Sequence, residues 1–255
     1  MLRNRLSELL AERNLKITRV ANDIPNLSRN TITATAQNES KMIQLETINS
    51  LCQYLGVQPN DFLEFVPFDI DISAAFSSPE ETEVEKGDFA EAINLSNIEV
   101  DLFMKQSSIK EEVGERTKTF DLTVLLTNDV KISLIDDVDG PQNTEISFQV
   151  MLGHLNDADT FNKQQSDFTN MWRTELTPGF RAILQKRISE TVTKEFTGQI
   201  DVLCKYAENK GFQKVNVDWN NFTFNYNFTF EDAFGFIKDP FSKSTVEFVT
   251  DSLPF

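Results

Sequence analysis

The sequence predicts a two-domain protein, in which a small all-α domain precedes a larger α+β domain with an antiparallel sheet and a long helix. A chain of 255 residues is long enough for two hydrophobic cores. Only two of the 22 Phe lie before residue 67. Residues 1–66 hold seven basic and seven acidic residues, so the rest of the chain carries the whole net charge of -16. These two differences in composition indicate two domains.

The composition excludes several classes of protein. A hydrophobic fraction of 40% excludes a disordered chain. The only cysteines, Cys52 and Cys204, are too few and too far apart for a disulfide framework or a thiolate metal site. No run approaches the roughly 18 apolar residues of a membrane span, and the first residues mix charge with leucine, unlike a secretion signal. We therefore expect a soluble, cytoplasmic protein that does not associate with membranes.

The boundary between the domains is expected in an acidic linker. Its clearest part, SSPEETEVEKG at 77–87, is polar and acidic and has no apolar period. We assign residues 1–68 to the N-terminal domain, residues 69–87 to the linker, and residues 88–255 to an acidic α+β domain of unknown type, with a regulatory or dimerisation role.

The N-terminal domain is predicted to be a bundle of short helices. Leucines at helical spacing indicate the first helix, and Pro25 ends the second because it disfavours helix at the residue before it. Ser28 is a suitable N-cap for the third, with Ile32 and Ala36 facing inward. Gly56 ends the fourth, and a fifth surrounds Asp61. The predicted helices span residues 2–13, 17–23, 29–36, 45–55 and 61–65.

This pattern resembles the Cro/Xre-type helix-turn-helix domain of phage-repressor-like regulators. The resemblance rests on the order and spacing of short elements over residues 2–66: Val20-Ala21, Leu27-Ser28-Arg29-Asn30-Thr31-Ile32, Leu45-Glu46-Thr47-Ile48 and Leu55-Gly56-Val57. It implies a five-helix, lambda-repressor-like fold whose third helix enters the major groove of DNA. A local charge of +3 over residues 1–45 is consistent with a polyanionic partner.

The resemblance also implies the residues that contact DNA. Arg29, Asn30, Thr33 and Ala34 would face the bases, because Arg suits guanine, Asn suits adenine, and methyl groups suit thymine. Residues around that helix would hold phosphates, and the start of the helix would offer backbone donors. The full predicted set is Thr18, Arg19, Asn26, Ser28, Arg29, Asn30, Thr31, Thr33, Ala34, Asn38, Ser40 and Lys41.

Three positions depart from the usual pattern of the family. Ile17 stands where many relatives carry Gln, which removes one usual phosphate contact. Lys16 replaces the usual Ser or Thr cap of the second helix. Pro25-Asn26 makes the turn one residue longer than usual.

The larger domain is predicted to contain an antiparallel meander followed by a long helix. Alternating apolar residues indicate strands at 97–104, 117–127, 130–136 and 145–152. Thr177 caps a helix that keeps its apolar period until Gly211, which at ~1.5 Å per residue spans roughly 50 Å. Such a length implies either an interruption at Gly198 or packing on another subunit.

Residues 221–230 alternate strictly, with aromatic rings on one face and Asn or Thr on the other. Three interpretations of the aromatic face stay open: a core between sheet and helix, a ligand cavity, or a subunit interface. Nucleic-acid stacking is disfavoured because an acidic domain repels phosphate.

No catalytic, cofactor or metal site is predicted, so we expect the protein not to be an enzyme. His154 is the only histidine, and residues 136–140 fail the spacing of a calcium loop, since its first and twelfth positions would be isoleucines. No phosphate loop or zinc-protease motif is present.

The sequence therefore predicts a sequence-specific transcriptional regulator, a repressor that binds palindromic operators in double-stranded DNA as a homodimer. The acidic domain would hold the dimer or respond to a protein or small-molecule inducer. The alternative is a protein-interaction regulator of the antitoxin or anti-repressor-target type, whose acidic domain binds a protein partner and whose DNA binding is autoregulatory.

Overall fold

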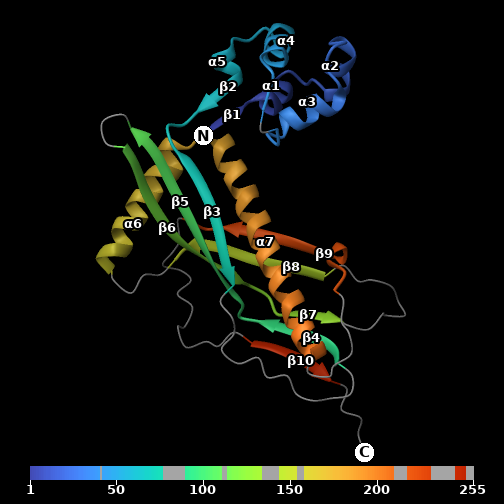
Figure 1. Ribbon diagram of the computed structural model, residues 1–255, viewed down its shortest axis with the longest axis vertical. Coiled ribbons are helices and arrows are strands. Elements are labelled where there is room, and N and C mark those ends of the chain that lie inside the picture. Colours follow the sequence, from blue (N-terminus) through green and yellow to red (C-terminus); the bar gives the residue numbers. More distant parts are fainter. Residues whose placement is uncertain are drawn as a thin grey trace, which may run out of the picture.

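The computed structural model describes residues 1–40, 42–76, 90–110, 114–133, 144–153, 158–209, 217–230 and 245–250. Figure 1 shows a helical N-terminal domain at one end of an elongated molecule, with helix α7 running from it along the larger domain. In the described part of the chain, no helix is both long and apolar enough to cross a membrane.

The N-terminal domain packs short helices around one core and closes with a two-stranded ribbon. Leu6, Val20, Ile32, Leu51 and Phe62 are fully buried in that core. Gly56 ends α4 in the left-handed conformation with φ of 66°, as predicted. The elements are α1 Leu6–Glu12, α2 Ile17–Asp23, α3 Arg29–Ala36, α4 Leu45–Leu55, α5 Pro59–Phe62, β1 Leu2–Asn4 and β2 Leu63–Phe65.

The ribbon corrects two predicted helix boundaries. We expected the first helix to begin at residue 2 and the fifth to extend to residue 65, but both segments are strands that pair antiparallel, with Leu2 opposite Phe65. The side chain of Asn4 accepts a hydrogen bond from Leu6 N at 3.0 Å, which starts α1 only after the strand. Pairing between strands at opposite ends of the domain leaves no local signal in the sequence.

The predicted linker is wrong in its first half. Residues 69–76 form β3 (Asp69–Phe76), which pairs with β5 (Glu99–Lys110) in the sheet of the larger domain. Between β2 and β3 only three residues remain, and Val66 and Phe68 among them are buried in the core of the larger domain. The two domains are therefore joined directly. The remainder of the predicted linker, residues 77–87, lies outside the described residues.

The larger domain contains two sheets. The five-stranded sheet has the order β3-β5-β6-β8-β9, with β6 Gly114–Leu126, β8 Thr144–Leu152 and β9 Phe222–Phe228. The three-stranded sheet is antiparallel in the order β10-β4-β7, with β4 Ala90–Ser96, β7 Val130–Ser133 and β10 Thr245–Thr250. β8 and β9 run parallel, so the prediction of an antiparallel sheet is wrong for this pair. The connection between them is long and contains helices, as a crossover between parallel strands requires.

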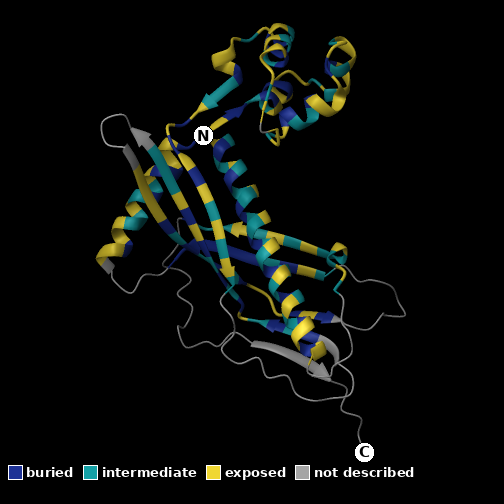
Figure 2. Ribbon diagram, in the orientation of Figure 1, coloured by how far each residue is buried: buried dark blue, intermediate teal, exposed yellow. Residues whose placement is uncertain are grey.

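Three helical segments form that crossover: α6 Ala158–Asn170, the π-helix η1 Met171–Glu175, and α7 Pro178–Asn209. A short 3-10 helix, η2 Trp219–Asn221, then leads into β9. α7 is a single helix of 32 residues that continues through Gly198. Its buried stripe, which runs from Phe180 to Ala207, packs in the core of the same chain, and Figure 2 shows this stripe along the helix. The length of α7 is therefore explained without a second subunit.

Candidate DNA interface

The third helix of the N-terminal domain forms where local signals predict it. Ser28 caps α3, because its Oγ accepts a hydrogen bond from Thr31 N at 3.0 Å. Ile32 is fully buried and Ala36 is 8% exposed, so one side of α3 is held in the core. The opposite side is left for a partner.

The base-facing candidates lie on that outer side. Arg29 and Asn30 are exposed, whereas Thr33 and Ala34 are half-buried. Within the described residues neither the Arg29 nor the Asn30 side chain makes a hydrogen bond or an ion pair, so both are available to base edges. Thr33 Oγ1 donates to Arg29 O at 2.9 Å, which leaves its methyl group for an apolar contact. The base contacts themselves stay a prediction.

The start of α3 also offers backbone donors. Helix geometry leaves the first N–H groups of a helix without intrahelical acceptors, and the cap at Ser28 satisfies that of Thr31. The N–H groups of Arg29 and Asn30 therefore remain, at the positive end of the helix dipole. Thr31, which is exposed, shares a 2.8 Å hydroxyl–hydroxyl hydrogen bond with Ser28. This geometry suits a phosphate oxygen.

The phosphate candidates before α3 are all exposed. Thr18 and Arg19 lie on α2, and Asn26 lies in the turn between α2 and α3. Arg19 Nε is 3.6 Å from Asp23 Oδ2 in an exposed ion pair, which is weak enough to exchange for a phosphate. Asp23 also accepts a 2.6 Å hydrogen bond from Tyr54 Oη, which ties α2 to α4 and raises the pKa of Tyr54.

Asn38 was predicted to contact phosphate, but in the structure its side chain binds Asn4. Its Oδ1 accepts hydrogen bonds at 2.8 Å from both N and Nδ2 of Asn4, and its Nδ2 donates to Asn4 O at 3.1 Å. Asn38 also takes the left-handed conformation, with φ of 55°. The side chain therefore fastens β1 to the end of α3 instead of reaching outward.

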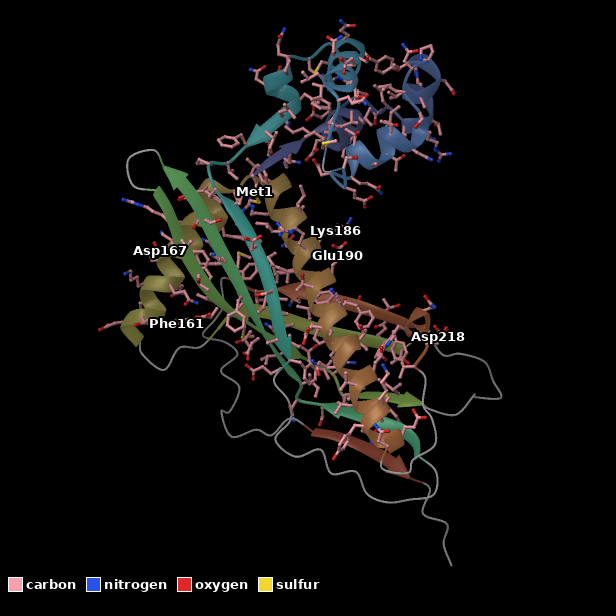
Figure 3. All side chains as sticks on the ribbon, viewed as in Figure 1. Met1, Phe161, Asp167, Lys186, Glu190 and Asp218 are labelled. Atoms are coloured by element: carbon pink, nitrogen blue, oxygen red, sulfur yellow. The ribbon has the colours of Figure 1, made fainter. Side chains whose placement is uncertain are left out.

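The loop after α3 touches the larger domain. Glu39 Oε1 lies 3.2 Å from Lys186 Nζ, and Lys186 is also 3.7 Å from Glu190 Oε1 on α7. Figure 3 shows Lys186 and Glu190 on the part of α7 that approaches the N-terminal domain. Ser40 is exposed, and Lys41 lies outside the described residues.

The contacts between the domains were not predicted. Arg3 is 7% exposed and donates from Nε to Glu64 Oε2 and from Nη1 to Glu8 Oε1, both at 2.6 Å. Its guanidinium lies 5.6 Å from the ring centroid of Phe180, at the start of α7. Thr177 donates to the same oxygen of Glu64 at 2.9 Å. The residues of α7 lie more than 100 positions from their partners in the N-terminal domain, so no sequence pattern could indicate the contacts.

No catalytic constellation accompanies this surface in the described ranges. Among those residues, no group of three or more His, Cys, Asp or Glu could hold a metal ion. Burial raises the pKa of Cys204 to about 11 and also raises that of Cys52, so neither thiol is poised as a nucleophile. His154 and residues 136–140 lie outside the described residues.

The N-terminal domain matches a known family of DNA-binding domains. Residues 5–67 match the family model described as the Cro/C1-type HTH DNA-binding domain. The chain is also similar to the crystal structure of a candidate DNA-binding protein from Bacteroides fragilis, at 26% identity over 25% of this chain and 100% of that chain, with a TM-score of 0.23. No curated protein matches the chain. The match to the family model shows that the N-terminal domain is a Cro/C1-type helix-turn-helix domain, a DNA-binding domain.

Proposed function

We propose that this protein is a sequence-specific transcriptional repressor that binds palindromic operators as a homodimer. The observation that carries the proposal is the outer side of α3, where exposed Arg29 and Asn30 stand beside free backbone N–H groups in a Cro/C1-type domain. Arg and Asn are the side chains that make bidentate contacts to guanine and adenine. A protein held on a promoter in this way excludes other proteins from it.

Dimer binding is supported by the energetics of recognition. One helix offers three or four side chains to the bases, and each bidentate pair discriminates by about 1–3 kcal/mol. Specific binding exceeds non-specific binding by about 4–10 kcal/mol, and the two bidentate candidates on α3, Arg29 and Asn30, reach only the lower part of that range. Two copies on two half-sites double the base contacts.

The acidic domain would restrict DNA to the N-terminal surface. All of the net charge of -16 lies after residue 66, and a domain of this charge repels phosphate. We assign to this domain the dimer contacts, the response to an inducer, or both.

Operator binding by Arg29 variants tests the proposal. A footprint of the purified protein on DNA upstream of its own gene first supplies the operator and the half-site spacing. We expect Arg29→Ala to weaken operator binding by about 1–3 kcal/mol and to relax preference at one base pair in each half-site. Arg29→Lys retains the charge but not the bidentate fork, so it should lose the same preference.

Two further variants separate base reading from phosphate binding. Lys41→Ala should weaken binding to every sequence and flatten its salt dependence. Lys205→Ala removes the same charge from the exposed side of α7 in the larger domain. It should change neither the affinity for DNA nor its salt dependence. Unchanged operator binding by Arg29→Ala, together with loss of base preference in Lys41→Ala, would show that the roles are wrongly assigned. A footprint with a single, unrepeated half-site would contradict the dimer.

A further inference from the structure

An open groove lies between α7 and the aromatic face of β9. The rings of Phe224, Tyr226 and Phe228 point toward α7 but are only half-buried. Their inner sides pack in the core, where Phe148 stacks on Tyr226 at 5.4 Å between ring centroids. Their outer sides border a hollow of about 680 Å³. This volume falls within the range of sites for small organic molecules, and the hollow is broadly open to solvent.

The residues of α7 that line the groove are polar or charged and leave it open. Gln185, Ser189 and Thr193 recur every four residues and line the hollow opposite the strand. At its far wall, Thr193 Oγ1 lies 2.6 Å from Tyr226 Oη, in a hydrogen bond that joins helix and strand. The neighbouring stripe of α7, which includes Leu184 and Ile188, is fully buried. Helix and sheet are thus well packed on one side and open on the other.

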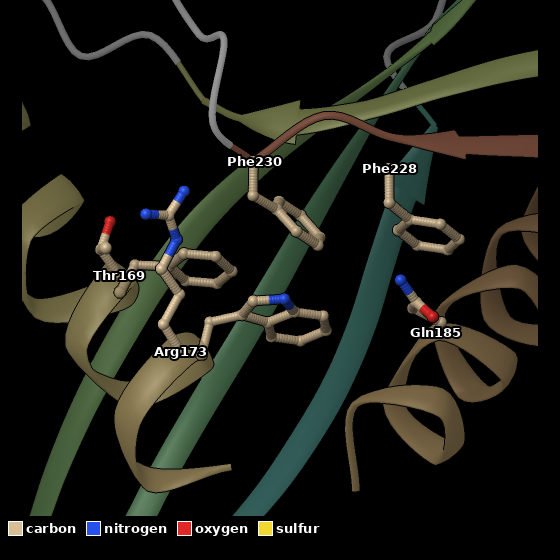
Figure 4. A pocket seen from close by; sticks show the side chains of 7 residues that line it. Thr169, Arg173, Gln185, Phe228 and Phe230 are labelled. Carbon is tan, nitrogen blue, oxygen red and sulfur yellow. The ribbon is translucent and has the colours of Figure 1, made fainter. Parts of the chain in front are cut away.

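The groove continues into a smaller hollow of about 120 Å³, which shares Gln185 and Phe228 with it. Figure 4 shows this end, where Phe230, Thr169 and Arg173 surround the opening. Its walls are rings in mutual contact, with centroids 4.7 Å apart for Trp172–Phe230 and 5.0 Å apart for Phe168–Phe230. Because these rings are mostly buried, the floor of the groove is preformed.

One wall of the smaller hollow is the π-helix η1. Trp172 and Arg173 belong to it, and Thr169 precedes it at the end of α6. π-Helical turns are rare in proteins and frequently occur at functional sites. Trp172 and Arg173 both border the smaller hollow.

Charged side chains lie along the rim of the groove. Three cationic side chains line the two hollows, against the single carboxylate of Glu190: Lys186, Lys194 and Arg173. Lys186 pairs with Glu39 and Glu190, and Lys194 makes no ion pair within the described residues. Lys194 is thus an exposed cation at the rim with no ion pair among the described residues, and it suits the anionic group of a ligand.

From this geometry we infer that the groove between α7 and β9 is a binding site for a small, ring-bearing organic anion. The ring system lies on the half-exposed rings of β9, and the anionic group meets Lys194 at the rim. The hydroxyl and amide groups of Ser189, Thr193 and Gln185 supply the few polar contacts that orient a ligand in a mostly apolar pocket.

Titration of the full chain with 8-anilinonaphthalene-1-sulfonate tests the inference, because this probe is a ring-bearing anion whose fluorescence rises in apolar surroundings. We expect one probe per chain. Lys194→Glu should weaken its binding by roughly tenfold, since it places a carboxylate beside the sulfonate. Ser189→Trp should abolish binding by filling the groove. Lys205→Glu makes the same charge change on the same helix outside the groove and should weaken binding by less than about twofold.

The neutral analogue N-phenyl-1-naphthylamine tests the part played by charge. It should bind more weakly than the sulfonate, and Lys194→Glu should not change its affinity. Equal weakening of sulfonate binding by Lys194→Glu and Lys205→Glu would overturn the site, as would the absence of stoichiometric binding. Sedimentation measures the oligomeric state of the same variants. If Lys194→Glu or Ser189→Trp dissociates a dimer, the groove is a subunit interface and the inference fails.

Discussion

Thr177 Oγ1 donates a 2.9 Å hydrogen bond to Glu64 Oε2 and thereby joins the residue before α7 to strand β2 of the helix-turn-helix domain. The same hydroxyl accepts a 3.4 Å hydrogen bond from Phe180 N, so the residue that starts the long helix also holds the other domain. Glu64 Oε2 in addition accepts from Arg3 Nε at 2.6 Å. With only three residues between β2 and β3, these contacts join the DNA-binding domain directly to α7.

Glu64→Gln should lower the free energy of unfolding by about 3 kcal/mol, because it leaves the mostly buried Arg3 without one of its two carboxylates. Urea denaturation measures the change. Glu190→Gln is the matched control: it removes a carboxylate from an exposed pair with Lys186 and should change stability by less than about 1 kcal/mol. Equal losses in the two variants would mean that the Arg3–Glu64 ion pair contributes no more than a surface pair.

Gly179→Ala should destabilise the protein, although alanine favours helix by up to about 1 kcal/mol over glycine. A Cβ at Gly179 would overlap the guanidinium of Arg3, and that group cannot move without giving up its ion pairs with Glu8 and Glu64. Gly198→Ala, in the same helix, meets nothing within 4 Å and should instead raise the melting temperature. A stabilising effect of both substitutions would contradict the close approach.

Asn38→Ala should destabilise the N-terminal domain by about 2–3 kcal/mol, because it leaves the backbone N–H of Asn4 without its acceptor and strains a left-handed residue. Asn38→Gly should recover only the part due to strain. In folded Asn38→Gly, the salt dependence of DNA binding should equal that of the parent protein. A weaker salt dependence of DNA binding in this variant would show that Asn38 contacts phosphate after all.

The free energy of unfolding should decrease at alkaline pH because Tyr226 loses its proton. Burial raises its pKa from 10.0 to about 12, so the folded state holds the phenol proton more tightly than the unfolded state. This contribution is complete below about pH 10 and is lost as pH rises toward about 12. Tyr226→Phe should flatten the melting-temperature profile in that window. Thr193→Val removes the 2.6 Å hydrogen bond but keeps the phenol of Tyr226, so this variant should still lose stability at alkaline pH.

The features that could be predicted are those in which neighbouring residues determine the conformation. Ser28 caps α3 through a residue three positions ahead, and Gly56 ends α4 by taking a positive φ itself. α7 is helical over 32 residues because its apolar period repeats within the segment. The surface of α3 could be predicted in the same way, since burial of Ile32 and Ala36 places Arg29 and Asn30 outside.

The features that were missed depend on partners far along the chain. The sequence of β1 is typical of a helix start, and only its pairing with β2 makes it a strand. The sequence of β3 is typical of a linker, and only its pairing with β5 makes it a strand. Asn38 has the side chain of a phosphate ligand, and only the position of Asn4 shows that the side chain is occupied. The groove exists because α7 packs closely on one part of the sheet and leaves the rings of β9 half-covered.

The sequence by itself determined the helix-turn-helix domain, its outward polar side and the acidic character of the larger domain, since cap, period and charge are local properties. Tertiary structure alone decided how the domains are joined, which way β9 runs, and where a ring-lined groove stays open. Those outcomes depend on pairings and approaches between residues far apart along the chain, whose free energy is gained only when folding brings them together.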